Sequence, residues 1–353
     1  LKLILVCLLC LASIGILYIL FVLLYNTFTE FKPPAKVHVK VRGNAPQVID
    51  TGKHLTLLTW NIGYAGLGKE MDFFYEGGEM VQPGREQNEK YFNGILNFLE
   101  EQSQYDMILL QEVDFGSKRS YGEDQQEEIT EILPAHTSVS AVNYQSRYVP
   151  VPLFNPMGKV NSGLVTFSLY KPIEADRIAT PGAYAWPKKM FMLKRCFLVS
   201  RFKITGDKEL VLIHLHNSAF DDASEQREAE TELLRSVALP EFEKGNYVIA
   251  GGDWNQNPPQ FHLSGIENYE AREVRPLDKS LFSEDWTWAY DPRFPTNRDV
   301  DAPFDPDSTK TSVIDFFLLS PNVEKVDVKT QDLGFEHSDH HPVSLTVILK
   351  TEN

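Results

Sequence analysis

Short apolar runs with the length of β-strands recur along the chain, and five of them end on Asp, Glu, Asn or His. These runs are Leu55–Asn61, Met107–Glu112, Leu210–His216, Tyr247–Asn255 and Ser312–Asp315. A sixth polar cluster, His-Ser-Asp-His-His-Pro at 337–342, precedes a last apolar run, Val343–Leu349. Strands are rigid, so we expect their polar ends to converge on one rim of a sheet. Oxygen donors gathered in this way suit a hard divalent cation, and nearby imidazoles would face the anion that it attracts.

Two longer segments have the pattern of helices. Between 86 and 102, apolar residues recur at Phe92, Ile95, Leu96 and Leu99, which is a helical spacing. The capping box 222–225 predicts a second helix that runs to about residue 243. Strands and helices alternate without a strict βαβ rhythm, which favours packed sheets with helices outside them.

Two further regions are predicted to be irregular. From about 256 to 310 the chain is rich in Pro, Asp and Trp, which predicts long loops with small helical pieces. Such loops are a typical place for substrate contacts. The segment 29–53 contains Pro33, Pro34 and Pro46 and has little periodicity, so it is predicted to be an extended tether.

The first segment has the character of a membrane anchor. Leu3 to Tyr25 is broken only by Ser13 and Gly15, and it is about as long as a bilayer-spanning helix. The alternative is a cleaved signal peptide, but the apolar stretch exceeds the usual h-region and no clear cleavage site follows it. We expect a transmembrane anchor at 1–28, the tether at 29–53 and one folded domain at 54–350.

The membrane orientation follows less directly from the sequence. One lysine precedes the apolar stretch and four basic residues follow it before residue 43, which would keep the domain in the cytoplasm by the positive-inside rule. Because that rule is weak for long domains, we expect an extracytoplasmic domain.

The charge distribution bears on the substrate. The net charge is −15, and residues 1–52 contribute +3, so the remainder carries −15 − 3 = −18. Such a domain repels polyanions at long range and disfavours bulk nucleic-acid binding. It does not exclude a nuclease, because a metal ion can supply the charge that the phosphate needs. Nothing in the sequence indicates an obligate protein partner.

Paired polar residues at the strand ends suggest hydrolytic chemistry. Asp253 and Asn255 follow two glycines and have i, i+2 spacing, so they share one side of an extended segment. A carboxylate there can position or deprotonate a water molecule. His214 and His216 also have i, i+2 spacing; we select His216 as catalytic because it lies nearer the strand end, and interpret His214 as a buried structural histidine. Asp315 lies within an apolar run and needs a partner, for which we expect an imidazole, with a salt bridge to an Arg as the alternative.

Several fragments, in this order, resemble the endonuclease/exonuclease/phosphatase superfamily, which has the deoxyribonuclease-I-like fold. They are Thr59-Trp-Asn61, Gln111-Glu-Val-Asp114, His216-Asn-Ser-Ala219, Gly252-Asp-Trp-Asn255, Ile314-Asp315 and Ser338-Asp-His340. The resemblance spans about 54 to 349. It implies a four-layer α/β sandwich, with two packed central β-sheets flanked by helices, that hydrolyses phosphoesters with Mg²⁺ or Mn²⁺.

The resemblance also implies a role for each matching residue. Metal binding falls to Glu112, with Asn61 and Asp339 beside it; water activation falls to Asp253 with Asn255; phosphate stabilisation falls to His216 and His340, with Asp315 as the partner of His340. The family's usual Thr-His dipeptide is Leu215-His216 here. For substrate binding we select Arg119 and Arg298, with a surface role as the alternative for both. Tyr144, Arg147 and Asn161 are weaker candidates.

Three functions follow from these features. The first is a membrane-anchored, divalent-metal-dependent phosphoesterase that acts on a small or lipid-linked phosphoester, sphingomyelinase-like or phosphatase-like. The acidic domain favours a zwitterionic head group over a polyanionic inositide. The second is a membrane-tethered nuclease with the same chemistry. The third is a catalytically silent binding domain, which the complete set of expected site residues disfavours.

Overall fold

The apolar runs form strands whose alternate side chains face opposite sides of a sheet. In β3 (His54–Asn61), Leu55 and Leu57 join the core between two sheets, whereas Leu58 and Trp60 pack on the other side with residues of α2 (Arg85–Glu101). Full burial on both faces explains why these strands are almost continuously apolar rather than alternating.

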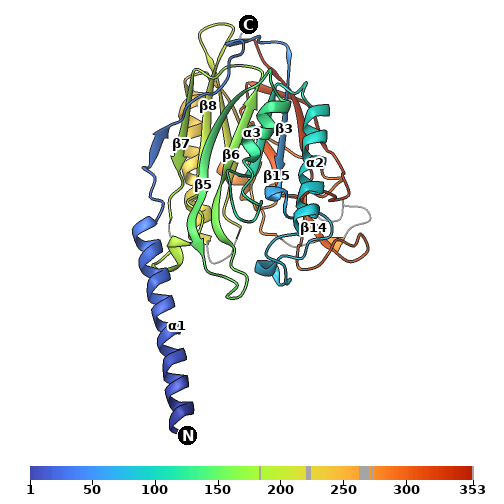
Figure 1. The fold of residues 1–353 in the computed structure, drawn as a ribbon. Coiled ribbons are helices and arrows are strands. Elements are labelled where there is room, and N and C mark those ends of the chain that lie inside the picture. Colours follow the sequence, from blue (N-terminus) through green and yellow to red (C-terminus); the bar gives the residue numbers. More distant parts are fainter. Residues whose placement is uncertain (183, 220–223, 262–269, 272–273, 352–353) are drawn as a thin grey trace.

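The computed structural model describes residues 1–182, 184–219, 224–261, 270–271 and 274–351 (Figure 1). Within these ranges, one eight-stranded sheet has the order β1-β7-β8-β9-β10-β15-β12, with β2 also paired to β8, and a six-stranded sheet has the order β16-β17-β3-β4-β6-β5. A third sheet of three short strands has the order β11-β14-β13. The remaining strands are β1 (Lys36–His38), β2 (Val48–Ile49), β4 (Met107–Asp114), β5 (Thr137–Val149), β6 (Gly158–Ser168), β7 (Glu174–Ala179), β8 (Cys196–Ile204), β9 (Glu209–His216), β10 (Tyr247–Asp253), β11 (Glu270–Ala271), β12 (Thr287–Ala289), β13 (Asn297–Arg298), β14 (Lys310–Ser312), β15 (Asp315–Leu319), β16 (Val323–Thr330) and β17 (Val343–Leu349).

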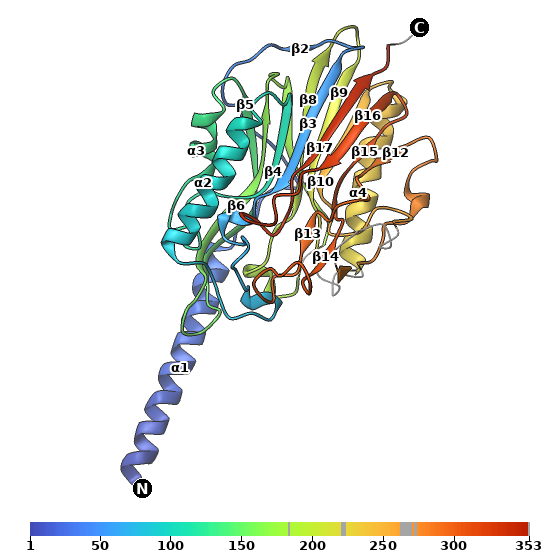
Figure 2. The ribbon, with the colours of Figure 1, turned by 90° about the vertical axis from the view of Figure 1, so that its right-hand side faces the viewer.

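Helices cover the outer face of each large sheet. Figure 2 shows α2 and α3 (Gln125–Ile132) on one side and α4 (Ser224–Glu243) on the other. Leu234 and Ala238 of α4 pack with the outward side chains of β9, β10 and β15. The arrangement confirms the predicted four-layer α/β sandwich.

The predicted elements are found with shifted ends. The helix expected from 86 to 102 is α2, and the helix expected to end near 243 is α4, although residues 222 and 223 of its capping box lie outside the described ranges. The long strand β5 forms an antiparallel hairpin with β6. The region from 256 to 310 contains a 3-10 helix (Lys279–Leu281) and also β12, β13 and β14, which were not predicted.

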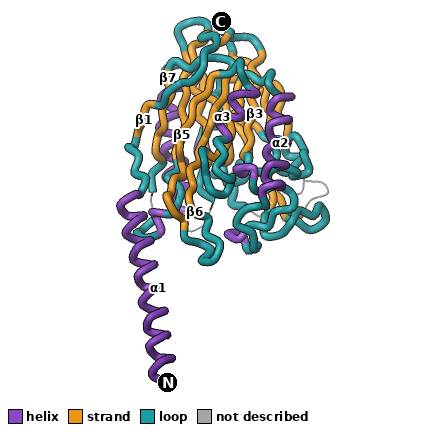
Figure 3. Tube along the Cα trace, viewed as in Figure 1, coloured by secondary structure: helices purple, strands orange, loops and turns teal. Residues whose placement is uncertain are grey.

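The N-terminal segment forms one helix, α1 (Lys2–Thr29), long and apolar enough to cross a membrane. It projects from one end of the domain, as the tube in Figure 3 shows. The following segment, expected as a tether, is extended but not free. Its strand β1 pairs antiparallel with β7, and β2 pairs parallel with β8. Residues 36–49 therefore belong to the folded unit.

Candidate active site

Strand register places three candidate residues side by side. His216 at the end of β9 is level with Asp253 at the end of β10, and Asp253 is level with Asp315 at the start of β15. All three positions are strand termini in register, so they share one rim of the eight-stranded sheet. Hydrogen-bond register within this sheet thus accounts for the convergence of these three residues.

The neighbouring sheet contributes Asn61 and Glu112 to the same rim. Asn61 ends β3, and its Nδ2 lies 3.3 Å from Glu112 Oε1 and 3.1 Å from Asp253 Oδ2. Glu112 sits in a bulge of β4 against β6 and has a φ of 55°, in the left-handed region. Residues other than glycine adopt this conformation at a cost, and such strain gathers at functional sites.

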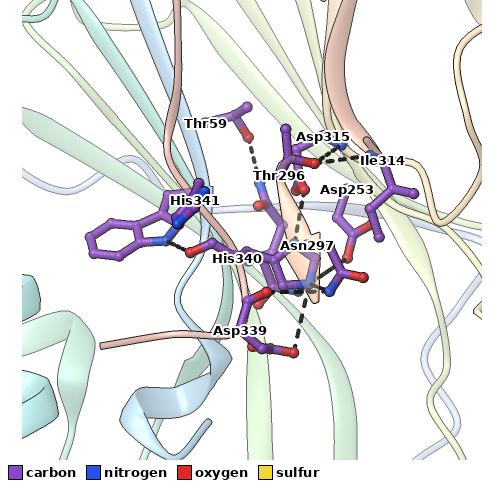
Figure 4. Close-up of polar contacts among 12 residues, drawn as sticks. Thr59, Asp253, Thr296, Asn297, Ile314, Asp315, Asp339, His340 and His341 are labelled. Atoms are coloured by element: carbon purple, nitrogen blue, oxygen red, sulfur yellow. Dashed lines mark hydrogen bonds and ion pairs between the residues drawn. The ribbon is translucent and has the colours of Figure 1, made fainter. Parts of the chain in front are cut away.

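His340 lies between several carboxylates (Figure 4). Its Nδ1 is 2.8 Å from Asp315 Oδ2, and its Nε2 is 3.8 Å from Asp253 Oδ2 and 3.9 Å from Asp339 Oδ2. On the other side, His216 Nε2 is 3.4 Å from the same Asp253 oxygen. The Asp253 carboxylate therefore faces two imidazoles, and Asp315 fixes the orientation of one of them.

The two imidazoles differ in their electrostatic environment. Burial acts to lower the pKa of His340, but the carboxylates of Asp315, Asp339 and Asp253 outweigh it and raise that pKa to about 10. Burial lowers the pKa of His216 well below its usual value, and the positive charge of Arg195 adds to this. At neutral pH the site thus holds one cationic and one neutral imidazole.

Burial also raises the pKa of two acids at the rim. It raises that of Asp253 to about 6 and that of Asp339 to about 7, where neighbouring carboxylates add to the effect. With Glu112 and Asp315, four carboxylates face the single imidazolium of His340. Buried negative charge in such excess requires a counter-charge, so these donors fit a divalent cation.

One member of the expected metal-binding set is turned differently in this structure. The Asn61 amide points its nitrogen at the carboxylates, while its Oδ1 accepts a hydrogen bond from the Gly63 N–H at 3.0 Å. An oxygen ligand from Asn61 requires rotation of that amide.

The backbone around Asp253 leaves no room for larger residues. A Cβ added to Gly252, which has a φ of +140°, would lie 2.0 Å from the carbonyl oxygen of Leu215. Beyond Asp253, the Asn255 N–H donates to Asp253 Oδ1 at 2.9 Å and Asn255 Nδ2 donates to the carbonyl of Asn217. These bonds fix the turn that aims the carboxylate.

Comparison with known proteins identifies the family of the chain. Residues 58–340, which make up most of the chain, match the sequence profile of the Endonuclease/Exonuclease/phosphatase family. The chain belongs to this family. No curated protein matches the sequence.

Solved structures with the same fold include bacterial, vertebrate and human proteins. An endonuclease/exonuclease/phosphatase from Beutenbergia cavernae has 17% identity and a TM-score of 0.52, and the match covers 84% of this chain and 72% of that one. D. rerio TDP2 complexed with single-strand DNA product has 13% identity and a TM-score of 0.50, and the match covers 84% of this chain and 99% of that one. The human Nocturnin catalytic domain with bound sulfate has 14% identity and a TM-score of 0.50, and the match covers 88% of this chain and 97% of that one. At these identities the likeness shows the fold alone.

Within the family fold, the two histidines of β9 occupy different environments. His214 is fully buried between the sheets, with Nε2 2.6 Å from Gln111 Nε2 and Nδ1 3.0 Å from Thr166 Oγ1, and burial lowers its pKa to about 3. Its contacts are with Gln111 and Thr166, whereas His216 lies beside the carboxylates of Glu112 and Asp253. Of the two histidines, His216 is therefore the one placed at the rim.

The two arginines expected to bind substrate are engaged by the protein itself. Arg119 forms a paired ion contact with Asp114 at 2.9 and 3.1 Å and lies over the ring of Tyr64 at 3.5 Å. Arg298 is buried and donates to main-chain carbonyls, including that of Gly68 at 2.8 Å. Both guanidinium groups hold loops beside the rim in this structure.

Sequence reasoning missed Asn297, which lies within the site (Figure 4). Its Nδ2 is 3.0 Å from His340 Nε2, and its neighbour Thr296 accepts through Oγ1 from the N–H groups of Ile314 and Asp315. The signal was the adjacent Arg298, which marked the right loop but the wrong side chain for contact with His340. Strand β13 carries Asn297 to the rim.

Proposed function

We propose that this protein is a membrane-anchored phosphoesterase that depends on Mg²⁺ or Mn²⁺ and hydrolyses a small or lipid-linked phosphoester. One observation carries the proposal: a buried carboxylate, Asp253, faces one cationic and one neutral imidazole, and three further carboxylates surround them. This is the arrangement needed to activate a water molecule on one side of a phosphoryl group and to stabilise its charge on the other.

The residues divide the work as follows. Glu112, Asp339 and Asn61 would hold the cation, which when bound supplies a Lewis acid for the phosphoryl oxygens. Asp253 accepts the proton of the attacking water, and Asn255 holds its turn in place. His340, kept cationic by Asp315, and neutral His216 donate hydrogen bonds to the phosphoryl oxygens as charge builds on them.

The membrane and the substrate class are part of the same proposal. The apolar α1 supports anchoring of the chain, with the domain outside the cytoplasm. The net charge of −15 supports a small or lipid-linked phosphoester over bulk nucleic acid. A tethered nuclease would use the same residues and is the competing outcome of the test.

The test combines metal binding with turnover in the full chain. With Mg²⁺, hydrolysis of a generic phosphodiester should appear and should vanish with a chelator, and Mg²⁺ should raise the melting temperature. Glu112→Gln should remove the melting shift and cut turnover by about 100-fold or more. Exposed Glu324→Gln is the matched control and should change neither.

The pH dependence of the melting shift has a defined sign. Raised carboxyl pKa values stabilise the metal-free fold below pH 4, and this contribution is lost as pH rises through about 6 for Asp253 and 7 for Asp339. Because the cation offsets their charge, Mg²⁺ should stabilise the protein more at pH 8 than at pH 5. A chelator-resistant activity, or equal shifts at both pH values, would contradict the proposal. Comparing sphingomyelin, inositol phosphates and plasmid DNA then separates the esterase from the nuclease.

A further inference from the structure

Large apolar side chains are exposed in two loops at the end of the domain from which α1 projects (Figure 1). The loop between β5 and β6 exposes Val151, Leu153 and Phe154, and Phe154 is 97% exposed. The segment before β8 exposes Trp186 at 55%. A cluster of this kind differs from singly scattered apolar residues and marks an interaction surface.

Contacts with α1 fix both loops beside the helix. Tyr148, the residue before the last of β5, brings its hydroxyl to 3.1 Å from the Tyr18 hydroxyl. Near the end of the helix, Thr27 Oγ1 lies 3.1 Å from Met190 Sδ and accepts from Trp186 Nε1 at 3.3 Å. The helix and the two loops therefore approach any membrane as one body.

The position of these contacts along α1 determines how deeply the two loops lie in a membrane that α1 spans. Tyr18 lies seven residues inside Tyr25, the end of the apolar stretch, which is about 10 Å at 1.5 Å per residue. When α1 spans a bilayer, Tyr148 and the loop that follows it reach the interfacial zone. Phe and Trp side chains are favoured at that depth.

Basic residues are concentrated in these two loops and the strands beside them. Segments 142–162 and 179–199 contain six basic residues and no acidic one, although the whole chain carries −15. The six are Arg147, Lys159, Lys188, Lys189, Lys194 and Arg195. Lys194 is paired with Glu30 at 3.1 Å and Arg195 is bonded to the His216 carbonyl. Basic residues next to a membrane helix attract anionic head groups, at about 1 kcal/mol each when they lie near the surface.

The active-site rim lies at the same end of the domain. Ser162 of β6 is level with Asp114 at the end of β4, so the first four residues of β6 extend about 13 Å past the rim at 3.3 Å each. On the other sheet, Arg195 precedes β8 and donates to the carbonyl of His216 at 3.0 Å. Both exposed loops therefore border the catalytic residues.

We propose that residues 150–157 and 184–190 form a docking face that seats the domain on the bilayer holding α1. The apolar tips enter the interface of a membrane containing anionic phospholipid, and the active-site rim faces the lipid head groups. This inference rests on the proposed membrane anchoring and not on which phosphoester is cleaved.

Tryptophan quenching in the full chain tests the docking face. The protein is reconstituted into phosphatidylcholine vesicles containing phosphatidylglycerol, with a quencher on the lipid acyl chains. Of the five tryptophans, Trp60, Trp254 and Trp286 are buried, and Trp288 is partly buried against Trp254 in the core beneath α4, so all four should be protected. The quenched component of the wild type should therefore be lost in Trp186→Phe.

Placing one new tryptophan in that variant maps the surface. Phe154→Trp in the Trp186→Phe background should restore quenching. The matched control is Val48→Trp in the same background, because Val48 is exposed but pairs with Lys203 near the far end of β8. Quenching at Phe154→Trp should be several-fold stronger than at Val48→Trp, and weaker in vesicles of phosphatidylcholine alone.

Each of the other outcomes overturns a defined part of the inference. Equal quenching at the two positions, or none at either while the protein floats with the vesicles, overturns the docking face. Equal quenching with and without phosphatidylglycerol overturns the part assigned to the basic segments. Protein that does not float with vesicles overturns the anchoring and this inference with it, whereas metal-dependent turnover in detergent would still support the phosphoesterase.

Discussion

Replacing Asp315 by Asn should weaken the hold of His340 on its proton and lower the pKa of that imidazole. The pKa of His340 is raised from an ordinary 6.5 to about 10, and this rise is net of the opposing effect of burial. Because burial pulls the other way, the three carboxylates together supply more than this. Asp315 is the nearest at 2.8 Å, so even an equal third predicts that Asp315→Asn lowers the pKa by at least about one unit.

NMR titration of the His340 ring in the metal-free protein measures this directly, and the pH profile of kcat/KM with Mg²⁺ measures its consequence. The basic limb of the profile should move to lower pH in the variant, with a turnover loss of about 10²-fold or more. In the wild type, the stability that His340 contributes is present in full below pH 6.5 and lost as pH rises through about 10. Asp315→Asn should lower the pH at which this stability is lost.

The matched control is Asp291→Asn. Asp291 is also buried, but its carboxylate pairs with Arg293 at 2.8 and 2.9 Å and is not among the carboxylates that raise the pKa of His340. This change should affect stability and leave the His340 titration unmoved. A His340 pKa in Asp315→Asn that matches the wild type within a few tenths of a unit would refute the reasoning.

Two further predictions concern the strand ends. His216→Ala should lower kcat/KM by about 10²–10³-fold with little change in the free energy of unfolding. His214→Ala should mainly destabilise the fold, by about 2 kcal/mol or more. Kinetics and urea unfolding measure both effects, and a loss of turnover in His214→Ala with a loss of stability in His216→Ala would show that the roles of the two histidines are reversed. Gly252→Ala should destabilise the protein by more than about 1 kcal/mol, because the new Cβ meets the Leu215 carbonyl at a positive φ. Gly84→Ala, where a Cβ meets no atom within 4 Å, is its control in the same urea titration, and equal losses would contradict the steric argument.

Long apolar strands could be predicted from the sequence, and short ones could not. The runs ending at Asn61 and His216 are long enough to show burial on both faces, so both strands and their shared rim were expected. Strands β1 and β2 have three and two residues, too few for any periodicity, and the prolines around them favoured a free tether. Pairing with β7 and β8, which is non-local, decides their structure.

The site was predictable where chemistry alone selects the residue type. A buried Asp in an apolar run needs a partner, and His340 is that partner of Asp315. The arginines were harder, because a guanidinium is equally suited to a phosphate and to main-chain carbonyls, and only the packing around Arg298 shows which acceptors surround it. Asn297 carries no sequence signal of its own, since its role depends on a two-residue strand that ends beside His340.

The pairing of β1 with β7 has a practical consequence for anyone who wishes to remove the helix. A shortened chain beginning at His54 would strip β7 of its outer neighbour and leave a row of open N–H and C=O groups, which template aggregation. A chain beginning a few residues before Lys36 keeps that border closed. The safe point for truncation is therefore set by a three-residue strand and not by the first long one.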